Sequence, residues 1–238
     1  MRSIAICGTI SFLFVLASLS AMVQAGVENY TNESDESNLL IDDSTYYSSE
    51  NNTTLGWFAQ ASGIYDDTIE DSVSFQNGTT AVVGSFQSYI DFSYEFPGAL
   101  SNNGQGDVDF YIAWVDGNGT WQSVIGGGSH GFDRLESIEK LSTGDIVVSG
   151  TYCYNTVGDE CSLTLGELDP LNKTNADDDG NVFLARMSTD GIWLWATQIE
   201  SSSGVFEFSL SVTNQDEIHL GTIFTGIIEF NGQMIPGG

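Results

Sequence analysis

A short segment that recurs along the chain constrains the fold more than any other feature of this sequence. DGNGTWQSVI begins at Asp116, and DGIWLWATQI begins at Asp190. In both copies a Trp follows the Asp by five residues, at Trp121 or Trp195, and an Ile follows four residues later. A weaker copy, WFAQA, begins at Trp57. Repetition at intervals of several tens of residues is typical of repeat architectures, in which each unit is one supersecondary element.

Further landmarks recur between the tryptophans. Short alternating segments, each followed by a polar turn and a β-branched run, end at Gly84, Gly150 and Gly221, which lie 27, 29 and 26 residues after the tryptophans. Their length, their Gly, Asn and Asp boundaries and the lack of a 3.6-residue period favour strands over helices. Four or five short antiparallel strands make one blade of a β-propeller, which needs neighbours to bury its faces. The sequence therefore predicts an all-β fold of about two and a half to three propeller-type blades.

Other segments match between copies of the repeat. SYIDF, ending at Phe92, matches GIIEF, ending at Phe230, and FYIAW before Asp116 matches VFLAR before Asp190. Together with the Trp-led strand and the Gly-Ser-Phe and Gly-Thr-Tyr steps, this pattern resembles the bacterial and archaeal repeats known as seven-bladed bacterial propeller repeats. The resemblance covers about residues 57–238. It implies an extracellular propeller-type fold and no particular activity.

The repeats are unequal in length. We expect them at residues 57–120, 121–194 and 195–238, within a repeat region of residues 55–238. The second repeat carries an insertion, most of which follows Gly150. The third stops after its exit segment without a return strand, so the chain resembles a fragment of a larger propeller. Insertions in repeat proteins map to loops on one face, which is often the binding face.

Residues 1–25 are typical of a secretory signal peptide. Arg2 precedes an apolar run from Ile4 to Met22, and small residues stand at the positions before Gly26. An uncleaved membrane anchor is the alternative, because the run is just long enough to span a bilayer. With the signal removed, we expect a secreted or cell-surface protein with no membrane insertion.

Residues 26–54 are expected to form an acidic, disordered stalk. They contain seven Asp or Glu and no Lys or Arg, so they bury too little apolar surface to offset the entropy of ordering. The alternative is that Leu39–Ile41 or Tyr46–Tyr47 adds a strand to the last blade.

The charge of the chain argues against polyanionic partners. The formal net charge is −28, and removal of Arg2 with the signal leaves four basic residues against 33 acidic ones. Nucleic-acid binding depends on cationic contacts with phosphates, so neither nucleic acid nor an anionic membrane surface is an expected partner. Cation binding and life in salty water fit this charge.

Two cysteines remain after signal removal, Cys153 and Cys161. An even count in an exported chain predicts a disulfide, because the pair meets an oxidising compartment. The intervening YNTVGDE contains a Gly and several polar residues, so a turn can bring the two Cα atoms to about 5.5 Å, the usual separation. We expect this bond to hold the insertion of the second repeat. The alternative is a pair of reduced thiols.

One loop has the spacing of a calcium site. Asn175, Asp177 and Asp179, followed by Gly180, match N-x-D-x-D-G, in which alternate oxygen ligands converge on a hard cation. The twelfth position holds Arg186 where a bidentate Glu is expected, which excludes a regular EF-hand. A solvated acidic turn is the alternative. A calcium ion is the only cofactor that the sequence suggests.

No motif specifies a reaction or a catalytic residue. His130 and His219 lack zinc-ligand spacing, and the sequence has no Gly-x-Ser-x-Gly elbow and no phosphate loop with a lysine. Aromatic residues recur at matching positions, which favours packing between blades over a sugar-stacking platform. We therefore predict a non-catalytic extracellular binding or scaffold module whose partner is a protein or a glycan. The alternative is a secreted carbohydrate-active enzyme of sialidase-like architecture, because DGNGTW resembles the Asp-box turn of those propellers.

Overall fold

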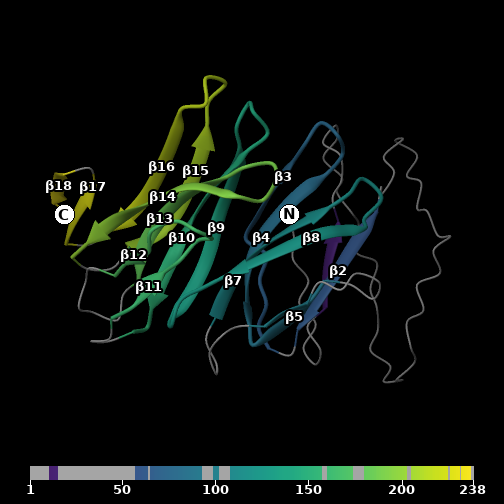
Figure 1. The fold of residues 1–238 in the computed structure, drawn as a ribbon, viewed down its shortest axis with the longest axis horizontal. Helices are drawn as coiled ribbons and strands as arrows, with labels where there is room; N and C mark the ends of the chain where they lie inside the picture. Colours follow the sequence, from purple (N-terminus) through teal and green to yellow (C-terminus); the bar gives the residue numbers. More distant parts are fainter. Residues whose placement is uncertain are drawn as a thin grey trace, which may run out of the picture.

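The computed structural model (Figure 1) shows the chain as β-strands, and no helix occurs in the part that it describes. The predicted all-β class is confirmed. The described residues are 11–15, 57–63, 65–92, 99–101, 108–156, 160–173, 180–202, 205–224, 226–230 and 232–236. The predicted stalk at residues 26–54 and most of the predicted signal peptide lie outside them.

Two antiparallel meanders of four strands form the centre of the molecule. The first has the order β3-β4-β7-β8, and the second has the order β9-β10-β13-β14. Their bounds are β3 Asp71–Ser74, β4 Thr80–Gln87, β7 Val108–Val115, β8 Trp121–Gly127, β9 Phe132–Lys140, β10 Ile146–Tyr154, β13 Asn181–Met187 and β14 Trp193–Ser201. We call these sheets the first and second meander. Each meander takes its last strand from the start of a Trp-led sequence repeat, so the sheets are offset by one strand from the repeats.

Shorter groups of strands flank the meanders. One sheet has the order β1-β2-β5-β6, β17 and β18 extend the second meander beyond β14, and β11-β12 and β15-β16 form two-stranded sheets. We call β15-β16 the third sheet. The bounds are β1 Ser11–Val15, β2 Phe58–Gly63, β5 Tyr89–Asp91, β6 Ala99–Ser101, β11 Ser162–Leu163, β12 Leu171–Asn172, β15 Val205–Val212, β16 Ile218–Phe224, β17 Ile227–Phe230 and β18 Gln233–Pro236.

Equivalent turns fix how the repeats correspond. In the turns that join β3 to β4, β9 to β10 and β15 to β16, the first residue donates its N–H to the carbonyl of the fifth, from Phe75, Leu141 and Thr213. Gly78 and Gly144 occupy the left-handed position with φ near 87° and 89°, and Asp216 takes that position in the third turn with φ 61°. Counted from these turns, residues of β9 and β10 lie 66 positions after those of β3 and β4, and residues of β15 and β16 lie a further 72 positions on. Residues of β13 and β14 lie 72 positions after those of β7 and β8.

The tryptophan correspondence differs from the one that the sequence suggests. Asp116 accepts the N–H groups of the residues two and four positions later, and Ser188 does the same in the second meander. Trp121 and Trp193 directly follow these two turns, and a bulge comes after each. Trp193 is therefore the counterpart of Trp121, and Trp195 lies two residues further along β14. The shared Asp-Gly pair misleads because Asp190 is in the middle of its turn, whereas Asp116 begins one.

The glycine correspondence also needs one correction. A Cβ atom on Gly84 would lie 2.0 Å from the Thr68 carbonyl oxygen, and one on Gly150 would lie 2.0 Å from that of Arg134. These two positions tolerate only glycine because the backbone of an earlier segment passes close to each. At Gly221 the nearest atom would be 3.8 Å away, which is an ordinary contact. The turn register makes Thr222, not Gly221, the counterpart of Gly150.

The two exit segments occupy equivalent places in the structure. Asp91 of β5 pairs with Ser62 of β2, and Glu229 of β17 pairs with Glu200 of β14. Glu229 lies 138 residues after Asp91, and Glu200 lies 138 residues after Ser62. This interval is the sum of the two repeat offsets, 66 and 72. Each exit segment thus leaves the sheet of its own repeat and pairs with the last strand of the preceding sheet. The same register makes Trp57 the counterpart of Trp195.

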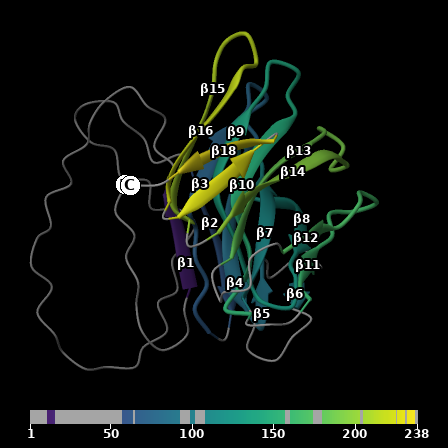
Figure 2. The ribbon, with the colours of Figure 1, turned by 90° about the vertical axis from the view of Figure 1, so that its left-hand side faces the viewer.

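The sheets are stacked face to face in sequence order (Figure 1). Figure 2 views the stack from its C-terminal end, with β18 and the third sheet in front of the meanders. The largest core lies between the meanders and includes Ala81, Val83, Phe110 and Ile112 with Leu135, Val148 and Phe183. A second core joins β2 to the first meander, and smaller clusters join the second meander to the third sheet. The described strands do not form a closed ring, so a propeller remains a prediction.

The described part of the predicted signal peptide is a strand. β1 runs antiparallel to β2, and its residues Ser11–Val15 lie within the apolar run. In the part of the chain that the structure describes, no helix is long and apolar enough to cross a membrane.

Candidate functional site

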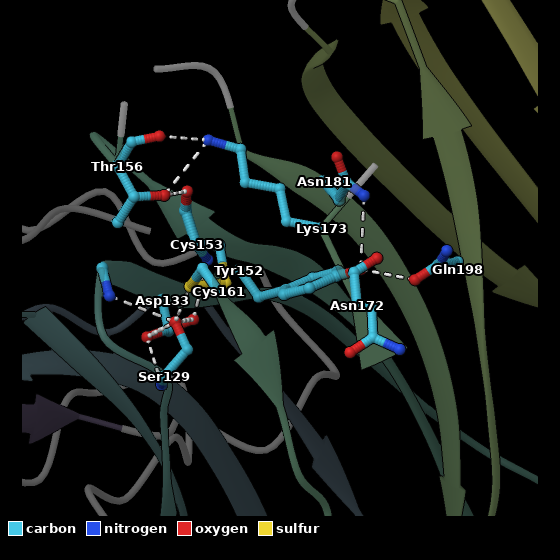
Figure 3. The surroundings of a disulfide bond; sticks show 11 residues. Ser129, Asp133, Tyr152, Cys153, Thr156, Cys161, Asn172, Lys173, Asn181 and Gln198 are labelled. Carbon is cyan, nitrogen blue, oxygen red and sulfur yellow. Dashed lines mark hydrogen bonds between the residues drawn. A yellow bond between two sulfur atoms is a disulfide. The ribbon is translucent and has the colours of Figure 1, made fainter. Parts of the chain in front are cut away.

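The predicted disulfide between Cys153 and Cys161 is present, with the two Cα atoms 5.9 Å apart (Figure 3). It closes the beginning of the long excursion between β10 and β13, in the insertion of the second repeat. Cys153 and Asn155 adopt left-handed backbone conformations with φ of 56° and 63°, so the chain turns sharply where β10 ends. Both cysteines are buried, and they belong to the core between the meanders.

A fully buried carboxylate holds the disulfide in place. Asp133, at the start of β9, accepts hydrogen bonds from the backbone N–H of Ser129 at 2.6 Å and from that of Cys153 at 3.0 Å. The Ser129 hydroxyl donates to the same carboxylate at 2.7 Å (Figure 3). Donors therefore face both oxygens, which offsets the cost of burying this carboxylate. Asp133 ties the loop after β8 to the end of β10.

Polar contacts also fix the far side of the excursion. The Tyr152 hydroxyl donates to the Gln198 side chain at 2.5 Å, and the Asn181 amide donates to that hydroxyl at 3.3 Å (Figure 3). The Lys173 ammonium donates to the Thr156 carbonyl oxygen at 2.5 Å. The first two bonds connect the end of β10 to β14 and β13, and the third joins the beginning of the excursion to its later part. Burial raises the pKa of Tyr152 to about 12, so its phenol is protonated at physiological pH.

The first meander has a carboxylate at the same position as Asp133. Asp67 lies 66 residues earlier, and it is 4% exposed. Neither of its oxygens accepts a hydrogen bond of ordinary geometry. Burial raises the pKa of Asp67 to about 7, and the N–H groups of Gln87 and Gly63 offset part of this effect. Gly63 is the counterpart of Ser129, so the first meander has no hydroxyl to donate at this point.

Sequence reasoning missed this pair of acids, although a signal was present. DTIE begins at Asp67 and DRLE begins at Asp133, and each Asp precedes the glycine at the strand crossing by 17 residues. In an acid-rich chain these two did not stand out. Their equivalence becomes visible once the turns fix the register.

The candidate calcium ligands Asn175, Asp177 and Asp179 lie outside the described residues, so the calcium site stays a prediction. Gly180 is described, and a Cβ there would lie 2.8 Å from the Tyr152 carbonyl oxygen. Close packing against β10 is therefore a reason for this glycine that is independent of any metal. Among the described residues, no group of three or more His, Cys, Asp or Glu is arranged to hold a metal ion.

Most of the recurring aromatic residues are packed inside the stack. Phe92 contacts Tyr111 and Trp121 edge to face, with ring centroids 4.9 Å and 5.2 Å apart. The Trp121 indole N–H donates to the Gln60 carbonyl oxygen at 2.8 Å, which joins β8 to β2. Phe230 differs from its counterpart Phe92, because it is 38% exposed at the C-terminal end of the stack.

The histidines and arginines of the described residues are dispersed over the fold. His130 is exposed in the loop between β8 and β9, and His219 is exposed on β16. Arg186 forms an ion pair with Asp145, and Arg134 is exposed on β9. Ser129 directs its hydroxyl at a carboxylate that donors already surround. Within the described residues, this arrangement braces the fold and does not pair a nucleophile with a base.

Comparisons with models of known protein families and with curated proteins find no match to this chain.

Proposed function

We propose that this protein is a non-catalytic extracellular module that binds a protein or glycan partner on a framework of propeller-type blades. The observation that carries the proposal is the contrast between a repeated framework and one element that departs from the repeat. The exits of the first and third repeats lie against the preceding sheet in the same register. The second repeat instead has a disulfide-closed excursion with its own short hairpin, β11-β12.

A rigid framework that carries one variable loop is a common arrangement in binding proteins. Repeat proteins also concentrate their insertions on the binding face. The excursion contains the Asn175–Asp179 segment, so the proposed calcium site belongs to the same element. The acidic chain favours a cationic ligand or a partner with a basic surface, because opposite charges steer association.

The disulfide supports an extracellular location. Disulfides persist in oxidising compartments and are rare in reducing ones. Together with the leader-like residues 1–25, the bond fits a protein that is secreted or displayed at the cell surface. The polar contacts around it point to a structural bond, since Asp133 anchors the backbone of Cys153 from inside the core.

The proposal can be tested on protein exported by a secreting host. Mass spectrometry of the product is expected to show a mature N-terminus at Gly26 and an intact Cys153–Cys161 bond. The mature chain is expected to bind glycan or protein targets on an array saturably and to release them unchanged. Hydrolysis of fluorogenic sialosides or other aryl glycosides, abolished by Arg134→Ala or Arg186→Ala, would overturn the proposal in favour of the enzyme.

Calorimetry tests the calcium component separately. Calcium is expected to release heat with the native chain, and the Asp177→Asn/Asp179→Asn variant is expected to lose that heat. An Asp190→Asn variant serves as a matched control, because it removes an exposed acid from a different turn. Equal heats from all three proteins would remove calcium from the proposal.

A further inference from the structure

Two hairpin turns of the first meander share one conformation and one sequence. In the turns at residues 75–79 and 116–120, the first residue donates its N–H to the carbonyl oxygen of the fifth, at 2.8 Å and 2.9 Å. The fourth residue is a left-handed glycine in both, with φ 87° at Gly78 and 83° at Gly119. Asn occupies the third position and Thr the fifth, so both turns read Asn-Gly-Thr, over residues 77–79 and 118–120.

This tripeptide belongs to a known class of modification signal. Asn-x-Ser/Thr is the acceptor sequence for N-linked oligosaccharides in exported chains, and the modified Asn lies on a surface loop. The equivalent turns of the second meander and the third sheet lack it, because their third residues are Thr143, Asp190 and Gln215. Asn172 begins another such sequence, but it lies in β12 and pairs with Ser162. The remaining ones lie outside the described residues, at Asn29, Asn32, Asn51 and Asn52.

Both turns present their asparagine in a way that accommodates a sugar. Asn77 and Asn118 are exposed, as a bulky oligosaccharide requires. The Asn77 Oδ1 atom accepts the N–H of Thr79 at 3.0 Å, which uses the oxygen of the amide and not its nitrogen. Glycosylation takes the nitrogen and keeps the carbonyl, so this bond survives modification. The second turn is fixed by a different side chain, because Asp116 Oδ1 accepts the N–H groups of Asn118 and Thr120.

The two turns lie side by side. A Cβ atom on Gly117 would lie 3.5 Å from the Gly78 carbonyl oxygen, which is ordinary contact distance. The corresponding turns of the second meander use polar groups to bind their neighbours. Thr189 donates its N–H to Asp145 at 3.3 Å, and Ser142 donates its N–H to Asp216 of the third sheet at 2.7 Å. The same end of the first meander thus has two adjacent acceptor sequences where the second has polar contacts between turns.

We propose that Asn77 and Asn118 are N-glycosylated during export. The Nδ2 atom attacks the anomeric carbon of a lipid-linked oligosaccharyl diphosphate. An N–C bond forms, the C–O bond to the diphosphate breaks, and the proton that the amide nitrogen loses balances the departing lipid diphosphate. The inference rests on the export that the proposed function also assumes, and it adds a covalent modification to that function.

Sugars at these turns would leave the disulfide-closed excursion accessible. The turn before β10 is equivalent to the one at Asn77, and β10 runs from it to the disulfide over nine residues. At about 3.3 Å per residue, the two ends of β10 are about 26 Å apart. Figure 1 shows the β3–β4 and β9–β10 turns at the upper end of their strands, with β11-β12 toward the lower end. The paired glycans would therefore shield the end of the stack that faces away from the excursion.

Glycopeptide mass spectrometry of the protein secreted by the cells that make it tests the inference. An intact oligosaccharide is expected on Asn77 and on Asn118. The sugar itself must be weighed, because Asn-Gly pairs also deamidate spontaneously and thereby change mass without carrying a glycan. An exported chain with its mature N-terminus and unmodified asparagine in these turns would overturn the inference and leave the proposed function standing. A chain retained inside the cell would overturn both.

Variants exported by a eukaryotic secreting host identify the attachment atom. Asn77→Asp and Asn118→Asp are each expected to lose one glycan and to keep the fold. Asp190 holds the third position of the equivalent turn in the second meander, so an aspartate fits there. Thr79→Ala is expected to lose the sugar on Asn77, and Thr79→Ser is the matched control that retains it. Sugar that persists on these peptides in both Asp variants, or that ignores the change at Thr79, would place it on other atoms and overturn the inference.

Discussion

The first and second meanders have the same strand order, turns and register, but they satisfy their polar groups differently. In the second, Asp133 is surrounded by donors from Ser129 and Cys153, and a disulfide anchors the strand that carries one of them. In the first, Asp67 occupies the same position without a hydrogen bond of ordinary geometry. The two meanders therefore share one topology although their equivalent buried carboxylates have different hydrogen-bond surroundings.

The contrast extends to the far end of the meanders. The Asp145–Arg186 ion pair joins the second turn to β13. The corresponding residues of the first meander are Thr79 and Trp114, which form no such pair. The second meander is thus braced at both ends, and it carries the insertion proposed to bind a partner. Four predictions test this contrast, in decreasing order of expected effect.

Asp133→Ala is expected to destabilise the protein by about 4 kcal/mol, because buried donors lose their acceptor and a cavity opens. Urea denaturation at pH 7 measures the change in the free energy of unfolding. Asp67→Ala at the matched position is expected to cost far less, because no hydrogen bond of ordinary geometry is lost. Equal losses for the two variants would contradict the contrast.

Asp67→Asn is expected to stabilise the protein above neutral pH. Burial raises the folded-state pKa of Asp67 from 3.8 to about 7, so the folded state holds its proton more tightly than the unfolded state does. The native chain therefore loses stability as pH rises from about 4 to about 7, and the neutral amide avoids this loss. We expect a gain of about 2–3 kcal/mol at pH 8 and almost none at pH 4, allowing for water that enters on ionisation.

Denaturation of both proteins at a series of pH values and constant ionic strength provides the measurement. The difference between the two curves isolates Asp67 from the other acids. A difference that does not change between pH 4 and pH 8 would mean that Asp67 ionises normally in the folded state.

Cys153→Ala/Cys161→Ala is expected to cost about 2–3 kcal/mol, the value for a short closed loop. The loss is expected to be local, with faster amide exchange in the excursion after β10 and unchanged exchange in the first meander. Hydrogen exchange followed by mass spectrometry separates the two regions. Faster exchange spread evenly over both meanders would show that the disulfide holds the whole fold.

Asp145→Asn is expected to cost only about 0.5–1 kcal/mol, because the ion pair with Arg186 is partly exposed. Arg186 holds the pKa of Asp145 below its usual value, so this contribution is present above about pH 4 and is lost as pH falls through the folded-state pKa. A double-mutant cycle with Arg186→Met measures the coupling at pH 7 and pH 3. Coupling that is undiminished at pH 3 would exclude the carboxylate as its source.

The fold class, the disulfide and the equivalence of the two exit segments were accessible from the sequence. Alternation and turn residues indicate strands without reference to distant partners, and the paired cysteines needed only a turn. The exact register was not accessible, because it depends on hydrogen bonds between strands. Trp195 follows an Asp-Gly pair as Trp121 does, yet the bonded turn in the second meander begins at Ser188.

The candidate site was predicted only in part, for a similar reason. An acid-rich sequence does not show which carboxylates are buried, so Asp67 and Asp133 emerged only when the turns were aligned. The donors to Asp133 are backbone groups contributed by segments before and after it in the chain. Their positions follow from the stacking of sheets and not from local sequence.

Amide exchange resolved by NMR tests the central claim most directly. That claim is a shared register of the three sheets in which, among the described residues, β16 pairs with β15 alone, whereas β4 and β10 each pair on both edges. The account predicts slow exchange for nearly all amides of β4 and β10. In β16 it predicts slow exchange for the amides that face β15 and fast exchange for the alternate ones other than Thr222. Uniform protection along β16, matching β4 and β10, would show that β16 is paired on both edges and would contradict the account.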